Sequence, residues 1–171
     1  METRDALMAR RNVREFKPDP IAKEALDDVL EAGRRSPSSK NTQRWDFIVC
    51  TDRTQLQQLA KAWSYGGHVA GSAATVVLLA PVSQDQGERE SIQYDLGQVT
   101  MSMMLAAADA GIGSCHSGIG DQDLVRDLFR FPTDRTAAVM ISFGYPAGRP
   151  LKPIRKPNRR AFEDVVHRAI W

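Results

Sequence analysis

Two short polar segments near the N-terminus hold the residues best suited to ligand chemistry. The first, residues 10–14, reads Arg-Arg-Asn-Val-Arg and places three guanidinium groups and one amide within five residues. The second, residues 36–45, reads Ser-Pro-Ser-Ser-Lys-Asn-Thr-Gln-Arg-Trp and carries several small hydrogen-bonding side chains. Guanidinium groups bind phosphates and ring carbonyls, whereas hydroxyl and amide groups bind the edge of a polar heterocycle. Together the two segments predict a site for a phosphorylated, planar ligand.

Each segment also has an ordinary interpretation. Arg10, Arg11 and Arg14 have no acidic run near them in the sequence, so a solvated basic patch is the simplest alternative. For segment 36–45 the alternative is a plain connection between a helix and a strand, in which Ser, Pro and Asn are common. However, four hydrogen-bonding side chains fall within six residues, directly before an apolar strand: Ser38, Ser39, Asn41 and Gln43. This density favours a ligand site at the mouth of a sheet.

The elements that must position these segments follow from the spacing of apolar residues. Helical spacing or capping predicts helices over residues 2–11, 21–35, 52–62, 90–110, 121–129 and 161–169. Apolar and β-branched runs predict strands over residues 45–50, 74–80, 113–117 and 137–143, with a polar loop at 82–90. Such alternation, with helices in excess, indicates an α+β chain with one central sheet and a single domain over residues 1–171. Helix 90–110 is apolar around its circumference, which predicts a place in the core or in a subunit interface.

Composition excludes several classes of partner. The 23 basic and 21 acidic residues leave a net charge of +2, too small to indicate binding to nucleic acid or to a membrane surface. No run of 18 apolar residues exists to span a bilayer, and the charged start of the chain lacks the apolar stretch of a secretory signal, so we expect a cytoplasmic protein. Cys50 and Cys115 lie in apolar, strand-like surroundings and are predicted to be buried free thiols rather than a disulfide.

Other nucleotide and metal motifs are absent from the sequence. Residues 111–116, Gly-Ile-Gly-Ser-Cys-His, fail the dinucleotide fingerprint because His116 stands where glycine is required. His68, His116 and His167 show no ligand spacing with the cysteines, so no metal site is predicted. His116 is expected to pack or hydrogen-bond in the core, although it lies near the glycine-rich stretch 117–120. The basic stretch 149–160 is interpreted as an ordered arm around a partner subunit rather than as a nucleic-acid tail.

The order of these motifs resembles the nitroreductase family of flavin mononucleotide (FMN) enzymes. That family carries Arg-Arg-Ser-x-Arg-x-Phe, then Pro-Ser-Ser-x-Asn-x-Gln-Pro-Trp before a strand. The pattern is met here by Arg10, Arg11, Arg14, Phe16, Pro37, Ser38, Ser39, Asn41, Gln43 and Trp45. Residues 94–97, 111–115 and 156–166 resemble the family's central helix, next strand and closing basic motif. The resemblance therefore covers nearly the whole chain in the right order.

The resemblance implies a three-layer α/β/α fold with a mainly antiparallel central sheet, in an intertwined homodimer with FMN at the interface. It assigns these residues to FMN: Arg10, Arg11, Asn12 and Arg14, Pro37, Ser38, Ser39, Asn41 and Gln43, Gly118, and Arg159 or Arg160. Of these, Arg14 would approach the pyrimidine side of the flavin ring and Asn41 its N5 edge. Gly118 would let the backbone approach the flavin face, and Arg159 or Arg160 would complete the phosphate site. No catalytic acid–base side chain is expected.

The implied activity is transfer of hydride from NADH or NADPH to an electrophilic small molecule such as a nitroaromatic or a quinone. Alternatives on the same scaffold are a dehalogenase, a dehydrogenase, a flavin-fragmenting enzyme or a non-enzymatic flavin-binding or flavin-storing protein. Three departures from the family pattern affect the choice of substrate more than flavin binding. Asn12 replaces the usual Ser, Arg44 replaces the usual Pro, and the chain is shorter than typical members.

Overall fold

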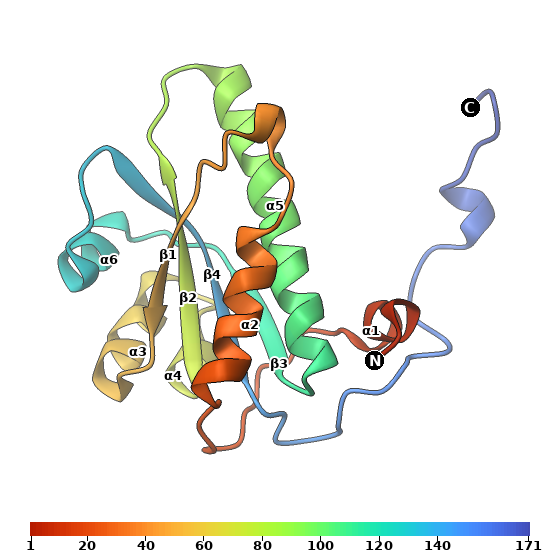
Figure 1. Cartoon of the computed structure of the whole chain (residues 1–171), viewed down its shortest axis with the longest axis horizontal. Coiled ribbons are helices and arrows are strands. Elements are labelled where there is room, and N and C mark those ends of the chain that lie inside the picture. The colour runs from red at the N-terminus through yellow and green to blue at the C-terminus, as the bar shows by residue number, and fades with distance from the viewer.

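An antiparallel sheet forms the centre of the computed structural model, which describes all residues from 1 to 171 (Figure 1). Its strands are β1 (Asp46–Cys50), β2 (Ala74–Pro81), β3 (Gly113–Ser117) and β4 (Arg135–Gly144). They lie in the order β1-β2-β4-β3, and every neighbouring pair is antiparallel. The predicted strands and the predicted antiparallel sheet are confirmed.

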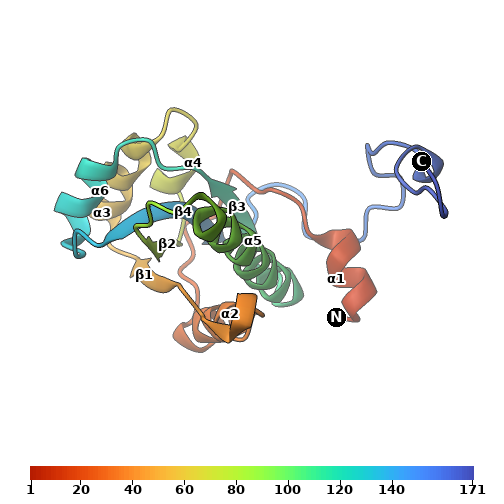
Figure 2. The same ribbon diagram turned by 90° about the horizontal axis from the view of Figure 1, so that it is seen from above.

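Helices cover both faces of this sheet, which gives the predicted three layers. The helices are α1 (Thr3–Ala9), α2 (Lys23–Arg34), α3 (Arg53–Leu59), α4 (Gly67–Ala70), α5 (Gln86–Asp109) and α6 (Gln122–Phe129), with 3-10 turns η1 (Ser39–Asn41), η2 (Ala60–Ala62) and η3 (Phe162–Asp164). Viewed from above, α2 and α5 lie on one side of the sheet and α3, α4 and α6 on the other (Figure 2). The α+β fold class is therefore confirmed.

Strand β2 shows why the sequence folds in this way. Its side chains alternate between the two faces: Val76 and Leu78 join the core under α2 and α5, whereas Val77 and Leu79 join the core under α3, α4 and α6. A strand buried on both faces reads as a nearly continuous apolar run, and this is the sequence signal that predicted it. The one buried polar residue of β2, Thr75, has its hydroxyl 3.0 Å from that of Ser72. β2 is consequently the centre of two hydrophobic cores.

Two predicted elements differ from the structure. Helix α5 begins at Gln86, inside the stretch predicted as a loop, because the Asp85 side chain accepts a hydrogen bond from the Glu88 backbone N–H and caps the helix. The predicted helix over residues 161–169 is wrong, since only the turn Phe162–Asp164 forms there. Nearly all stability of a short helix comes from packing of its apolar face, and these residues pack against no other element of the chain.

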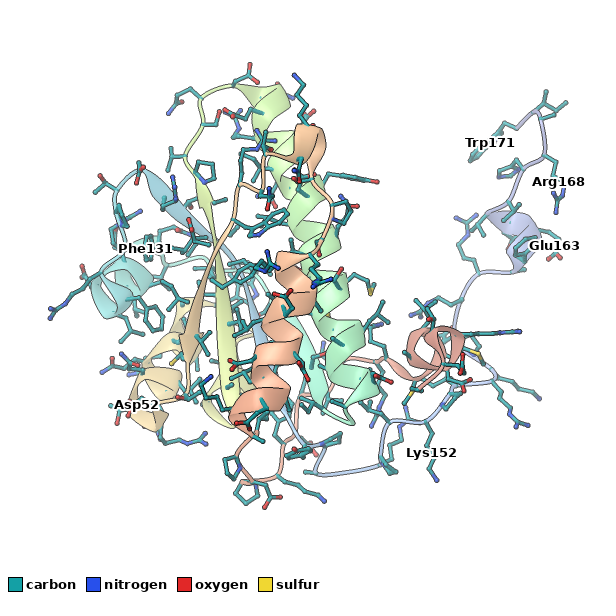
Figure 3. All side chains as sticks on the ribbon, viewed as in Figure 1. Asp52, Phe131, Lys152, Glu163, Arg168 and Trp171 are labelled. Atoms are coloured by element: carbon teal, nitrogen blue, oxygen red, sulfur yellow. The ribbon has the colours of Figure 1, made fainter.

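The C-terminal segment, residues 155–171, extends away from the sheet and its helices. Figure 3 shows Glu163, Arg168 and Trp171 far from the body, with Lys152 on the connection that leads to them. Every hydrogen bond made by this segment stays inside it, and none of its charges forms a salt bridge. It nevertheless exposes large apolar side chains, namely Phe162, Val165, Val166, Ile170 and Trp171. An exposed apolar set of this size is typical of a surface that another chain covers.

Both cysteines are buried and free, as the sequence predicted. Burial raises the pKa of the Cys50 thiol to about 11, and burial also raises the pKa of Cys115. Thiolate is the reactive form, so we expect iodoacetamide at pH 8 to leave both residues unmodified in the native protein and to label both after unfolding in urea. Intact-protein mass spectrometry measures this directly, and rapid labelling of the folded chain would contradict it.

No helix of the structure combines the length and the apolar character needed to cross a membrane.

Candidate functional site

The arginine segment, residues 10–14, lies in extended form beside strand β3. The Val13 backbone N–H donates to the carbonyl oxygen of Ser114 at 2.9 Å, and Asn12 forms an isolated bridge with the same residue. The Val13 side chain is buried and packs against Gly113. A Cβ atom at Gly113 would lie 2.8 Å from the Val13 side chain, closer than two carbons approach. A glycine is therefore required where the arginine segment docks on the sheet.

Replacing Gly113 by Ala is accordingly expected to destabilise the fold by about 1–3 kcal/mol, the usual cost of overpacking. The added methyl group must push Val13 away from β3 and would displace the neighbouring arginines with it. Urea unfolding followed by circular dichroism measures the effect. Gly67→Ala serves as the control, because a Cβ atom there meets nothing within 4 Å; equal losses in the two variants would argue against the close docking.

A cavity of about 830 Å³ opens beside this segment, within the range of about 300–1,000 Å³ usual for small-molecule sites. Its apolar lining comes from α5, β4 and the connection to the C-terminal segment, namely Leu96, Met101, Met104, Val139 and Ile154. Its cations are Arg10, Arg11, Arg149, Lys156 and Arg159. No carboxylate lines the cavity.

None of these five cations forms a salt bridge. Arg11 donates from Nη2 to the carbonyl oxygen of Arg149 at 2.5 Å, which fastens the start of the C-terminal segment to the arginine segment. Burial and the nearby Arg149 charge lower the pKa of Arg11, although an arginine remains charged in proteins. Unpaired guanidiniums above an apolar surface are a donor set for a ligand with an anionic group and an apolar body.

The second predicted segment forms a turn beside the N-terminal half of α5. Lys40, Asn41 and Gln43 all have left-handed backbones, with φ of 53°, 56° and 50°. Such conformations cost about 1–3 kcal/mol each for residues other than glycine and tend to occur at functional sites. The turn is closed internally, since the Gln43 N–H donates to the Ser38 hydroxyl at 2.9 Å. The Asn41 side chain is exposed and has no hydrogen-bond partner within the protein.

Comparison with known proteins identifies the family of this chain. The profile of the nitroreductase family matches residues 7–66 and 63–145. The chain belongs to the nitroreductase family. An Archaeoglobus fulgidus protein that bears the provisional name NADH dehydrogenase/NAD(P)H nitroreductase is 27% identical over 169 residues, which cover 96% of each chain.

Solved structures show the same fold. A Clostridium acetobutylicum protein provisionally named an NADH oxidase superimposes with a TM-score of 0.87 at 24% identity, covering 98% of this chain and 100% of its own. A Clostridium difficile protein named an FMN-dependent nitroreductase gives a TM-score of 0.83 at 24% identity, covering 97% and 98% of the two chains. The architecture of this nitroreductase-family protein is therefore that of known structures over almost its whole length.

The structure brings only part of the predicted flavin set together. Arg10, Arg11, Asn12 and Arg159 line the cavity, and Arg14 lines a smaller adjoining cavity of about 290 Å³ with Arg11 and Asn12. Arg160 does not line the large cavity, and its guanidinium instead donates to the Asp164 carbonyl oxygen. Within one chain, Arg159 rather than Arg160 is thus placed beside the N-terminal arginines.

The remaining predicted residues lie elsewhere in the chain. Pro37, Ser38, Ser39, Asn41 and Gln43 do not line the cavity. Figure 1 shows their turn beside the N-terminal half of α5, where Ser39 is held by Asp95. Gly118 packs near Trp63, whose ring would lie 3.8 Å from an added Cβ atom, and it too lies outside the cavity.

Three basic side chains that line the cavity, those of His116, Arg149 and Lys156, were not predicted as site residues. Arg149 and Lys156 fall in the basic stretch 149–160, which the sequence marked only as an arm. The expectation that His116 lies in the core is wrong: β3 is an edge strand, and His116 is exposed and lines the cavity. The buried histidine is His68, which lies 2.9 Å from the Ser142 hydroxyl and whose pKa burial lowers. No group of three or more His, Cys, Asp or Glu residues is arranged to hold a metal ion.

Proposed function

We propose that this protein is an FMN-dependent oxidoreductase that takes hydride from NADH or NADPH and reduces a small electrophilic acceptor such as a nitroaromatic or a quinone. The observation that carries the proposal is the cavity with five unpaired cations, no carboxylate and an apolar lining. It has the donor chemistry for a phosphorylated aromatic cofactor. The names of an NAD(P)H nitroreductase and an FMN-dependent nitroreductase among the similar proteins support the same chemistry.

Arg10, Arg11 and Arg159 are the residues we propose for the phosphate of FMN. When bound, FMN supplies the ring that accepts and donates hydride, so the protein itself needs to supply only binding, orientation and charge. Arg14, in the adjoining cavity, is proposed to place a cation near the pyrimidine edge, where it would stabilise negative charge. The apolar lining from α5 and β4 would exclude water from the ring.

We further propose a homodimer with FMN at the interface. In one chain, the turn at residues 38–43 contacts α5 at Asp95 and the cationic cavity is lined by the neighbouring Leu96 and Gly97, yet no residue of the turn lines the cavity. A second copy would bring its turn to this cavity, and Asn41 would gain a partner for its free side chain. The apolar side chains exposed on residues 155–171 supply the surface that such a partner would cover.

An absorbance spectrum of the purified protein after FMN addition and desalting tests this function. The expected result is retained flavin absorbance near 450 nm, a rough value for this chromophore, that bleaches with NADH or NADPH in the absence of oxygen. Reoxidation by a nitroaromatic or a quinone should follow. Bleaching with no turnover of either acceptor would favour another flavin chemistry on this scaffold, and retained flavin that neither donor bleaches would favour a storage protein. A protein that retains no flavin would refute the proposal.

A further inference from the structure

The turn at residues 38–43 is fastened to helix α5 by a buried carboxylate. Asp95 is only 3% exposed, and both of its carboxylate oxygens accept the Ser39 backbone N–H, each at 3.1 Å. A buried carboxylate is unfavourable unless charges and hydrogen bonds compensate it. The start of the turn is therefore tied to a fixed point on the central helix of the fold.

Arg44 fastens the other end of the same turn. Its guanidinium donates from Nη1 to Glu88 and from Nη2 to the Ser91 hydroxyl, both at 3.0 Å, and Nη2 also lies 3.8 Å from Asp95 Oδ2. The Arg44 side chain is only 20% exposed. The Ser83 hydroxyl and the Arg44 charge lower the pKa of Glu88, which keeps that carboxylate ionised for the contact. Side chains from three consecutive turns of α5 thus contact one guanidinium.

These two anchors enclose the three left-handed residues of the turn. Strained backbone persists only where the surrounding structure holds it, and here Asp95 and Arg44 are the contacts that connect the turn to α5. The turn's own hydrogen bonds, such as Gln43 N–H to Ser38, close it locally but do not orient it relative to the sheet. The orientation of the Asn41 side chain therefore depends on Asp95 and Arg44.

We propose that Asp95 and Arg44 are positioning residues for flavin binding, which act by holding the Ser38–Gln43 turn in its binding geometry. This inference rests on the proposed function. Neither side chain lines the cationic cavity, so neither is expected to touch the phosphate. The family pattern places Pro after Gln43, so the charged clamp through Arg44 is a property of this chain's own sequence.

Two variants and one control test the proposal in the full-length protein. Arg44→Ala and Asp95→Asn are compared with Asp46→Asn, which makes the same carboxylate-to-amide change in the exposed ion pair with Arg135 (3.0 Å) just past the turn. FMN affinity is measured by quenching of flavin fluorescence, and amide hydrogen exchange of residues 38–43 is measured without flavin. We expect both variants to raise the Kd for FMN about tenfold or more and to speed exchange of the Ser39 amide, with the control unchanged. Because both residues act through one turn, the Kd of the double variant should rise by less than the product of the two single fold-changes.

The outcomes separate this proposal from the function it rests on. Wild-type protein that binds FMN, together with variants of unchanged affinity, would overturn the positioning role alone, even if their melting temperatures fall. Faster exchange in the turn with no loss of affinity would overturn it as well. Wild-type protein that binds no FMN would overturn both proposals. If Asp95→Asn fails to fold, the test uses Arg44→Ala and the charge-conserving Arg44→Lys. The Kd of Arg44→Lys for FMN is expected to lie between those of Arg44→Ala and the wild type.

Discussion

Replacing Arg10 and Arg159 together by Ala is expected to weaken FMN binding by about 100- to 10,000-fold. A hydrogen bond to a charged group contributes about 1.5–3 kcal/mol, so the loss of two amounts to about 3–6 kcal/mol, and each 1.4 kcal/mol is about a factor of ten. The two arginines come from opposite ends of the sequence and line one cavity without any neutralising carboxylate. Their combined loss therefore removes a large share of the positive charge available to a phosphate.

The matched control is Arg155→Ala with Arg160→Ala. It removes the same number of cations from the chain, but neither residue lines the cavity. Titrations with FMN and with riboflavin, which lacks the phosphate, complete the design. The Arg10 and Arg159 pair should lower affinity for FMN far more than for riboflavin, and the control pair should change neither by more than a few-fold. Equal losses in both double variants would mean that net charge, not the cavity, determines binding.

Much of the fold could be predicted because its signals are local. Strand β2 is apolar at every position except Thr75, since both its faces are buried. Helix α2 carries apolar residues at helical spacing because only one of its faces meets the core. The end of α5 was marked by Gly111, which has φ of 73°. Its start was missed because a single capping side chain, Asp85, turned a polar stretch into the first turn of the helix.

The residue types of the candidate site could be predicted from the sequence, but their arrangement in space could not. The arginine segment and the polar turn are recognisable from residue types, yet nothing in the sequence states that only the first of them lines the cavity of its own chain. His116 is exposed because its strand, β3, lies at the sheet edge, whereas His68 is buried because α4 packs it against Ser142 of β4. Both depend on contacts between residues far apart in the sequence. The role of Arg44 likewise required the structure, because Glu88, Ser91 and Asp95 are more than 40 residues away in sequence.

Deleting residues 161–171 is expected to convert the proposed dimer into a monomer and to abolish tight flavin binding. The deletion removes all five exposed large apolar side chains of the C-terminal segment, from Phe162 to Trp171, while it keeps Arg159 and Arg160. Burying one such side chain contributes about 1.5–3 kcal/mol, so the deletion would cost an interface on the order of 10 kcal/mol as an upper estimate. Sedimentation velocity measures the mass, and an FMN titration on the same samples measures the affinity.

A charge-only variant separates apolar contact from electrostatics in this experiment. Glu163→Gln, His167→Gln and Arg168→Gln, combined in one chain, leave every apolar side chain of the segment in place and are expected to keep both the dimer and its flavin. If the shortened chain remains dimeric, the C-terminal segment does not form the interface. If it becomes monomeric but binds FMN as tightly as before, the cationic cavity of one chain is sufficient, and the turn of a second copy has no part in the site. Loss of dimer and flavin together is the expected result if a second copy supplies the turn that is absent from the cavity of one chain.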